Sequence, residues 1–407
     1  MPAYDLARRS VLCAALATIA LGCSSGSKDA PAPATDAGAD GAVDIDGVPL
    51  DTFIPQQLAT AKIPGMTGAI IKNGKVVWTG AYGLADVDKK TPMKVDTIFL
   101  VASISKTFTA CEAMRLVEQG KLKLDDDINL YLPFKVRNPK FPDVPITLRM
   151  LMTHTGGFVD DYIHIFSLIG QGDSPVTMRE FLEGILFSGG KYYEPGLFGD
   201  DKPGTKYGYS QVGATLVGYV VELAGGAPFD KQGKDGIFTP LGMADTSWRL
   251  ADVDITRMAI PYTYQVSKGQ VPNGNWGAPF YPAATIHTTA PQLAKYLTMY
   301  IRGGAYDGGQ LLKAETVAEM ERVQFPALNA DQGLFFQRHQ VDGVTVVGHS
   351  GGAPGVSTTM YLRPTDGVGV ITLTNSDLHI RVSLTRDEEL AAYEAIETRL
   401  FHEAAKY

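Results

Sequence analysis

Apolar runs rich in β-branched residues occur near both ends of the chain, with a long stretch of different character between them. These runs are residues 66–72 and 75–82 on one side, and 333–340, 343–349, 356–363 and 367–375 on the other. Asn73-Gly74 separates the first two runs and Asp366-Gly367 the last two, as expected for hairpin turns. The pattern therefore predicts antiparallel strands contributed by both ends of the chain.

Residues 103 to about 330 have the pattern of helix and loop, with many Pro and Gly, and we find no linker after residue 47. The last segment opens with Thr385 and Glu388 as a capping box and continues as an amphipathic helix to about residue 404. Its apolar side carries Leu390, Tyr393, Ile396 and Leu400. We expect one domain, residues 47–407, of the α+β class: an antiparallel sheet from both chain ends, flanked by helices, with a large mainly helical insert.

The first residues have the pattern of an export signal. A pair of arginines at 8–9 precedes an apolar stretch over residues 11–21, which is too short for the roughly 20 residues that span a bilayer. Residues 20–23 (ALGC) resemble a bacterial lipoprotein cleavage site, so we expect residues 1–22 to be a signal peptide and Cys23 to be lipidated. A plain signal peptide with a chance cysteine, or a twin-arginine signal, are alternatives.

The following segment, residues 23–46, consists almost entirely of small, Pro and acidic residues. Such a stretch cannot bury enough apolar area to offset the entropy lost on ordering, so we expect a flexible tether. A lipid, a tether and a globular body together predict an exported protein, anchored to a bacterial membrane and facing the periplasm or the cell exterior.

Composition and charge argue against several classes of function and of binding site. The 407 residues include 36 Lys and Arg against 44 Asp and Glu, a net charge of −8, which argues against non-specific nucleic-acid binding. Three cysteines exclude a disulfide framework and a thiolate zinc site, and Cys111 is expected to be a buried hydrophobe. The run 125–127 (DDD) is interpreted as a solvated turn, and the histidines lack metal-ligand spacing. We therefore expect no metal and no cofactor.

A Ser-x-x-Lys pattern occurs three times, at 25–28, 103–106 and 188–191. Only Ser103 opens a helical run, residues 103–119, on which it shares a face with Lys106, because residues three apart are neighbours on a helix. The polar side of this helix is predicted to hold Glu112, Arg115 and Glu118, and the buried side Phe108, Cys111, Met114 and Val117. A serine hydroxyl becomes a good nucleophile when a neighbour takes its proton, and a lysine of lowered pKa can do so. For an isolated match, an N-cap serine and a surface lysine would be the favoured interpretation.

Two further segments give this pair a context. Residues 203–211 (PGTKYGYSQ) place Tyr209 and Gln211 before an apolar helix, and residues 346–352 (VVGHSGG) place His349 at the end of a β-run. The order Ser-x-x-Lys, then Tyr-x-amide, then His-x-Gly resembles the serine β-lactamase and penicillin-binding protein superfamily. Within it, the sequence resembles the branch of class C β-lactamases, DD-peptidases and family VIII esterases. The segments 146–158 and 284–297 also resemble that branch, and the resemblance covers residues 50 to 405.

The resemblance implies a role for each of these positions. Ser103 would be the acylated nucleophile, Lys106 would take or relay its proton, and Tyr209 would be the general base of acylation. The backbone N–H groups of Ser103 and Gly352 would form the oxyanion hole. The resemblance thus implies an enzyme that cleaves a small-molecule or peptide substrate through an acyl-enzyme.

The substrate-binding positions implied by the resemblance are Gln211, His349 and Gly351, and two of them depart from the family pattern. Gln211 stands where an Asn is usual, and His349 stands where β-lactamases have a Lys. A neutral imidazole is a poorer anchor for the β-lactam carboxylate than an ammonium group. We therefore expect an esterase, an amidase or DD-peptidase, or at most a weak β-lactamase.

Two other hypotheses follow from the same residues. Residues 348–352 (GHSGG) match the nucleophile elbow of α/β-hydrolases, with Ser350 as nucleophile, but the elbow needs a helix next and a β-like run follows. The protein could instead be a non-catalytic, lipid-anchored sensor that captures a penicillin or muropeptide, although such relatives would be expected to lose Ser103, Lys106 or Tyr209.

The remaining candidates are interpreted as structural or left open. His154 is expected to bond loop backbone rather than react. The substrate would be set by loops 158–206 and 250–283, and the oligomeric state stays open. Aromatic residues that could form walls of the site, or equally pack in the core, are Tyr162, Tyr192, Tyr193, Phe198, Trp276, Phe280 and Tyr281.

Overall fold

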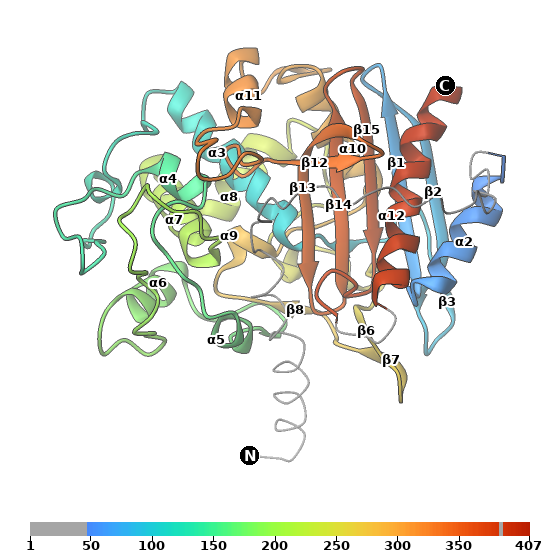
Figure 1. The fold of residues 1–407 in the computed structure, drawn as a ribbon, viewed down its shortest axis with the longest axis horizontal. Helices are drawn as coiled ribbons and strands as arrows, with labels where there is room; N and C mark the ends of the chain where they lie inside the picture. Colours follow the sequence, from blue (N-terminus) through green and yellow to red (C-terminus); the bar gives the residue numbers. More distant parts are fainter. Residues whose placement is uncertain (1–46, 382–385) are drawn as a thin grey trace, which may run out of the picture.

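A seven-stranded antiparallel sheet forms one half of the molecule in the computed structural model, which describes residues 47–381 and 386–407 (Figure 1). The strand order is β12-β13-β14-β15-β1-β2-β3. The strands are β1 Gly65–Lys72, β2 Lys75–Asp86, β3 Thr91–Pro92, β12 Gln337–Val341, β13 Val344–Ala353, β14 Val356–Arg363 and β15 Val368–Thr374. The sheet therefore joins both ends of the chain as predicted, with β15 pairing directly to β1.

Turn chemistry accounts for both predicted hairpins. Asn73 and Gly74 have positive φ angles of 52° and 67° between β1 and β2, which is the geometry that favours Asn-Gly. Gly367 has a φ of 65° at the turn into β15.

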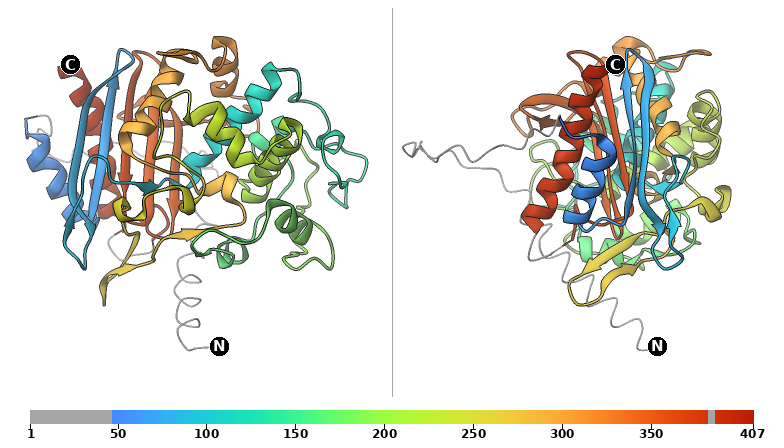
Figure 2. Two further views of the ribbon diagram at one scale, coloured as in Figure 1. Left: turned by 180° about the vertical axis from the view of Figure 1, so that it is seen from behind. Right: turned by 90° about the vertical axis from the view of Figure 1, so that its right-hand side faces the viewer.

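Helices cover both faces of the sheet (Figure 2). Helices α2 (Leu50–Thr60) and α12 (Arg386–Glu403) pack together on one face, and α10 (Ala290–Ile301) packs on the other. Alternation along β1 serves both sides, because Ile70 belongs to the cluster under α12 and Ile71 to the larger core under α10. On α12, Tyr393, Ile396 and Leu400 are buried and Leu390 is half-buried, which confirms the predicted apolar side.

The other half of the molecule is mainly helical and lies beside β13 (Figure 1). Its helices are α3 Ser105–Glu118, α4 Leu148–Met152, α5 Tyr162–Ser167, α6 Met178–Leu186, α7 Gln211–Gly225, α8 Phe229–Gly233, α9 Tyr281–Ala284 and α11 Ala314–Glu321. A π-helix covers Lys234–Phe238, and short 3₁₀ segments cover Ala102–Ile104, Ile128–Leu130, Leu250–Asp252 and Ile255–Arg257; a further one, Ala404–Lys406, follows α12 on the sheet side. Helices α3 and α7 pack against each other in the centre of this half.

The insert departs from the prediction of helix and loop alone, because short strands pair within it and, in one case, with a strand just before it. They are β4 Phe99–Leu100 with β9 His287–Thr288, β5 Gly170–Gln171 with β8 Trp276–Gly277, β6 Tyr262–Gln265 with β7 Gly269–Pro272, and β10 Ala305–Tyr306 with β11 Gly309–Gln310. Most of these strands have two residues, too few to show an alternating pattern in a sequence.

Three predicted details are wrong for identifiable reasons. Residues 333–336 are not strand, because Phe335 has a φ of 56° and the apolar side chains of this segment fill the core. Strand β13 does not end at residue 349 but runs to Ala353, since glycines hid its continuation. Glu112 does not face solvent: it is 1% exposed and pairs with Arg115 at 2.9 Å.

Several predictions concern residues outside the described ranges. The signal peptide at 1–22, the tether at 23–46, Cys23 and the cap at Thr385 all belong to this group. Within residues 47–381 and 386–407, no single helix is long and apolar enough to cross a membrane. A bent pair formed by Gln211–Gly225 and Phe229–Phe238 meets the length and composition together, with an angle of 77° between its halves.

Candidate active site

Ser103 lies in the 3₁₀ turn that leads from β4 into α3, next to strand β13. The residue before it, Ala102, has a φ of 47°, a conformation that a residue with a side chain adopts only under strain and that is often found at functional sites. The Ser103 side chain is 8% exposed, so its hydroxyl lies at the edge of the buried core.

Lys106 follows on the first turn of α3 and is completely buried. Its Nζ lies 3.2 Å from Ser103 Oγ, 2.7 Å from Gln211 Oε1 and 2.9 Å from the carbonyl oxygen of Ala283 on α9. The amide and the carbonyl oxygen can only accept hydrogen bonds. A neutral Lys106 amine would donate its two protons to these oxygens, which leaves its lone pair directed at the Ser103 hydroxyl.

Burial lowers the pKa of Lys106 from 10.5 to about 7, while the charge of Asp160 opposes this shift. A large fraction of the protein therefore carries a neutral Lys106 amine near neutral pH. His154 and His349, the histidines near this amine, have pKa values lowered mainly by burial and also by the charge of Lys106. Both imidazoles are consequently neutral at pH 7.

Tyr209 lies in the segment that enters α7, next to Ser210, the N-cap of that helix. Lys106 Nζ lies 4.9 Å from the centre of the Tyr209 ring, a cation–π distance when the amine is protonated. The ring also lies 4.2 Å from the ring of His154 and 6.3 Å from that of His349, measured between centroids. The structure thus brings together Ser103, Lys106, Tyr209 and His349 from three separate segments.

Strand β13 carries the site residues His349, Gly351 and Gly352. Its pairing with β12 ends at Gly348, so among the described residues no strand occupies that edge of residues 349–353. A Cβ at Gly351 would lie 2.2 Å from the carbonyl oxygen of Val101, so only glycine lets β13 approach the turn that carries Ser103. Gly351 therefore sets the approach of the strand, and Gly352 is half-buried one residue further along it.

His349 is buried, and burial lowers its pKa to about 3. Its Nδ1 faces the carbonyl oxygen of Ser350, which requires a proton on Nδ1 and leaves Nε2 as an acceptor. A neutral ring with a free acceptor does not attract a carboxylate. This electrostatic property agrees with the expectation, from the residue type, that His349 anchors a β-lactam carboxylate poorly.

Two neighbouring hypotheses are decided by the geometry. His154 has a structural contact as predicted, because its Nδ1 accepts a hydrogen bond from the backbone N–H of Ser210 at 3.2 Å. Ser350 is not the nucleophile of an elbow, because β13 continues past it and turns into β14, where an elbow requires a helix.

Sequence reasoning missed Asp160, a buried carboxylate at the N-terminus of α7. It accepts hydrogen bonds from Ser210 Oγ at 2.7 Å and from the backbone N–H groups of Gln211 and Val212. Burial raises the pKa of Asp160 to about 6, although these hydrogen bonds oppose the shift. The only signal in the sequence is an Asp directly after an apolar run, which cannot be told from the exposed Asp161 beside it.

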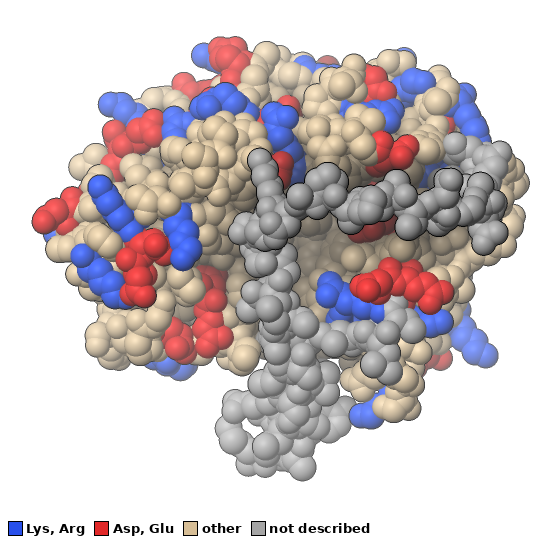
Figure 3. Space-filling model, viewed as in Figure 1, with Lys and Arg blue, Asp and Glu red and all other residues tan. Residues whose placement is uncertain are grey.

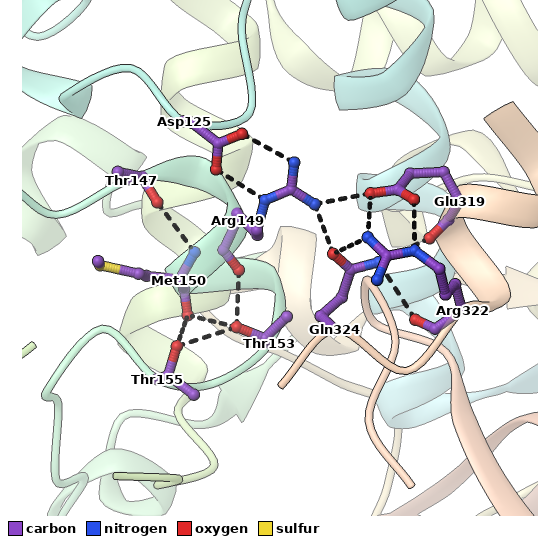
Figure 4. A network of polar contacts seen from close by, with 9 residues as sticks. All are labelled: Asp125, Thr147, Arg149, Met150, Thr153, Thr155, Glu319, Arg322 and Gln324. Atoms are coloured by element: carbon purple, nitrogen blue, oxygen red, sulfur yellow. Dashed lines mark hydrogen bonds and ion pairs between the residues drawn. The ribbon is translucent and has the colours of Figure 1, made fainter. Parts of the chain in front are cut away.

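A second polar network holds α4, the helix that precedes His154 (Figure 4). Arg149 donates two hydrogen bonds to Asp125, at 2.7 and 2.8 Å, and its other nitrogen contacts Glu319 at 2.7 Å. Glu319 also pairs with Arg322. The run 125–127 is thus a turn as predicted but not merely solvated, because each of its carboxylates has a side-chain partner.

The remaining features are metal ligands, surface charge and aromatic side chains among the described residues. Within the described parts of the chain, no group of three or more His, Cys, Asp or Glu is placed to hold a metal ion. Acidic and basic side chains are interspersed over the face shown in Figure 3. Of the aromatic candidates, Trp276, Phe280 and Tyr281 are buried in the core, and Tyr162, Tyr192, Tyr193 and Phe198 are half-buried.

Known proteins resemble this chain in sequence and in fold. The profile of the family described as Beta-lactamase matches residues 50–393. Protein flp of Staphylococcus aureus (strain MRSA252) is 26% identical over 330 residues, 80% of this chain but only 62% of that protein's length. Esterase EstB of Burkholderia gladioli is 30% identical over 223 residues, 52% of this chain and 54% of the esterase. The structure of D-amino acid amidase from Ochrobactrum anthropi SV3 has the same fold, with a TM-score of 0.70 at 22% identity over 87% of this chain and 99% of the amidase.

Proposed function

Because the chain belongs to the β-lactamase family, we propose that it is a serine hydrolase that forms an acyl-enzyme on Ser103 and cleaves an ester or an amide. The observation that carries this proposal is the environment of Lys106. Two obligate acceptors occupy two directions around its nitrogen, and the third direction meets the Ser103 hydroxyl.

The reaction would proceed in two acyl transfers. Neutral Lys106 takes the proton of Ser103, either directly or together with Tyr209, as the serine oxygen attacks the substrate carbonyl. The N–H groups of Ser103 and Gly352 stabilise the oxyanion, and the leaving alcohol or amine departs with the proton that the base received. A water molecule then gives its proton to the same base and attacks the ester of Ser103, and the base returns that proton to the Ser103 oxygen as the acid is released.

The absence of charge on His349 favours neutral esters and amides over β-lactams. A β-lactam carries a carboxylate, which a cation would bind, and His349 offers a neutral ring with an acceptor nitrogen instead. One relative is named an esterase and one structural neighbour a D-amino acid amidase, which agrees with this substrate class.

Hydrolysis of p-nitrophenyl acetate and butyrate tests the proposal. We expect turnover in the wild-type protein and none in Ser103→Ala, with an acyl adduct on the peptide that contains Ser103 by mass spectrometry. The matched control is Ser188→Ala, which alters an exposed serine in a second Ser-x-x-Lys pattern and should retain full activity. A stable adduct without turnover would favour the sensor hypothesis, and turnover in Ser103→Ala would overturn the proposal.

We also propose that the protein is exported and held to a bacterial membrane through a lipid on Cys23. The support is the sequence pattern of residues 8–23 followed by the Pro-rich and acidic tether. Expression of the full chain with a labelled fatty acid should label the wild type and leave Cys23→Ala unlabelled. Equal labelling of both proteins would contradict the lipid anchor.

A further inference from the structure

The segment 209–212 carries two groups that face Lys106, and a buried carboxylate contacts three of its residues, in addition to the contacts that His154 and Tyr162 make with its backbone. The Gln211 amide touches Lys106 Nζ and the Tyr209 ring lies beside it. Asp160 contacts Ser210, Gln211 and Val212, which lie between and just after these two groups. The carboxylate itself reaches the segment from the loop before α5.

The hydrogen-bond donors around Asp160 indicate that its carboxylate is ionised. The Ser210 hydroxyl accepts a hydrogen bond from the N–H of Gly213 at 2.8 Å, so its one proton is free to point at Asp160 Oδ1, 2.7 Å away. The backbone N–H groups of Gln211 and Val212 point at Oδ2. All three partners are donors, and a helix N-terminus favours negative charge, so the contacts suit an ionised carboxylate.

We propose that Asp160 is a positioning residue that holds Tyr209 and Gln211 against Lys106 and thereby determines the rate at which Ser103 is acylated. This inference rests on the proposed serine hydrolase function. Asp160 acts through the α7 N-terminus and not on the substrate. Its removal should therefore displace the amide acceptor of Lys106 and the Tyr209 ring together.

Asp160 also provides the negative charge that acts on Lys106. The other titratable groups facing this amine are Tyr209 and the imidazoles of His154 and His349, and both imidazoles are neutral at pH 7. Loss of the Asp160 charge should lower the pKa of Lys106, because the carboxylate favours the ammonium form. The acid limb of a pH profile reports this change, whereas a merely structural defect would leave that limb in place.

The test compares Asp160→Asn with the matched control Asp161→Asn. Asp161 is the next residue and also caps a helix, accepting from Ile163 N at 2.9 Å, but it is exposed and belongs to α5. With p-nitrophenyl butyrate in single turnovers, Asp160→Asn should acylate on the order of 10- to 100-fold more slowly, the range expected from a misplaced catalytic group. Its acid limb of kcat/KM should move to lower pH, and Asp161→Asn should match the wild type in both measurements.

Ser210→Ala provides a second variant if Asp160→Asn fails to fold. It removes the donor to Oδ1 but leaves the carboxylate, so acylation should slow several-fold, about the effect of one hydrogen bond, while the acid limb stays in place. Wild-type acylation by Ser210→Ala or Asp160→Asn, or an unmoved acid limb in Asp160→Asn, would overturn the inference. Absence of any Ser103-dependent hydrolysis in the wild type would instead overturn the proposed function on which it rests.

Discussion

Replacing Lys106 with methionine should separate the stability of this protein from its activity. Lys106 is completely buried, and its pKa falls from 10.5 in the unfolded chain to about 7 in the folded protein. Between these two pH values the unfolded chain binds one more proton than the native protein, so the free energy of unfolding rises with pH. Each unit of pKa difference corresponds to about 1.4 kcal/mol, which makes the full effect about 5 kcal/mol.

The effect can be measured over part of this range. From pH 7 to pH 9 the Lys106 contribution should raise the free energy of unfolding of the wild type by about 2 kcal/mol. Lys106→Met lacks this contribution, although it leaves the oxygens of Gln211 and Ala283 without their donor, which costs about 1–3 kcal/mol for each buried group. The absolute stability at one pH therefore mixes two effects, while the pH dependence isolates the buried charge.

Urea unfolding at pH 7, 8 and 9, followed by circular dichroism, gives the required comparison. The wild type should gain about 2 kcal/mol more than Lys106→Met between the end points, because all other titrating groups are common to both proteins. The variant should also lack acylation activity, as it has no base beside Ser103. Parallel pH dependences in the two proteins would refute the conclusion that this lysine is buried with a lowered pKa.

Four further substitutions test the site and its supports. Tyr209→Phe should slow acylation by about 10²- to 10⁴-fold without changing the melting temperature. Ser350→Ala should have a much smaller effect on hydrolysis. Equal effects of the two substitutions would contradict the roles assigned to Tyr209 and Ser350. Gly351→Ala should lower both kcat and the free energy of unfolding, because the added Cβ would lie 2.2 Å from a backbone oxygen. The loss in urea unfolding should be about 1–3 kcal/mol. An unchanged protein would show that β13 can shift freely. Arg149→Met should destabilise the protein by about 1–3 kcal/mol in thermal or urea unfolding, since Glu319 and Gln324 lose a half-buried partner. An unaffected midpoint would mean that the network of Figure 4 adds nothing to stability.

The longer strands agree with the prediction from the sequence, and the shortest strands do not. Strands β1, β2, β14 and β15 follow from their apolar patterns, because each residue's face depends on alternation within a few positions. The two-residue strands and the course of residues 333–336 did not follow, since neither has a period. Membership of the family was predicted from three short motifs and two flanking segments, and the α+β architecture from the pattern of strands and helices, and both are confirmed.

The sequence by itself determined which residues could meet through local geometry. Ser103 and Lys106 are three residues apart at the start of a helix, so their contact follows from the helical repeat alone. The hairpin at Asn73-Gly74 is local in the same sense.

Tertiary structure alone decided the chemistry of these groups. The partners of Lys106 at Gln211 and Ala283 lie 105 and 177 residues away along the chain, and the charge of Asp160 reaches it from yet another loop. Desolvation lowers a lysine pKa only when many distant segments exclude water together, and no short pattern records that sum. Asp160 and Asp161 are adjacent residues of the same type, so the sequence cannot distinguish them. The fold nevertheless buries Asp160 at the N-terminus of α7 and leaves Asp161 in solvent.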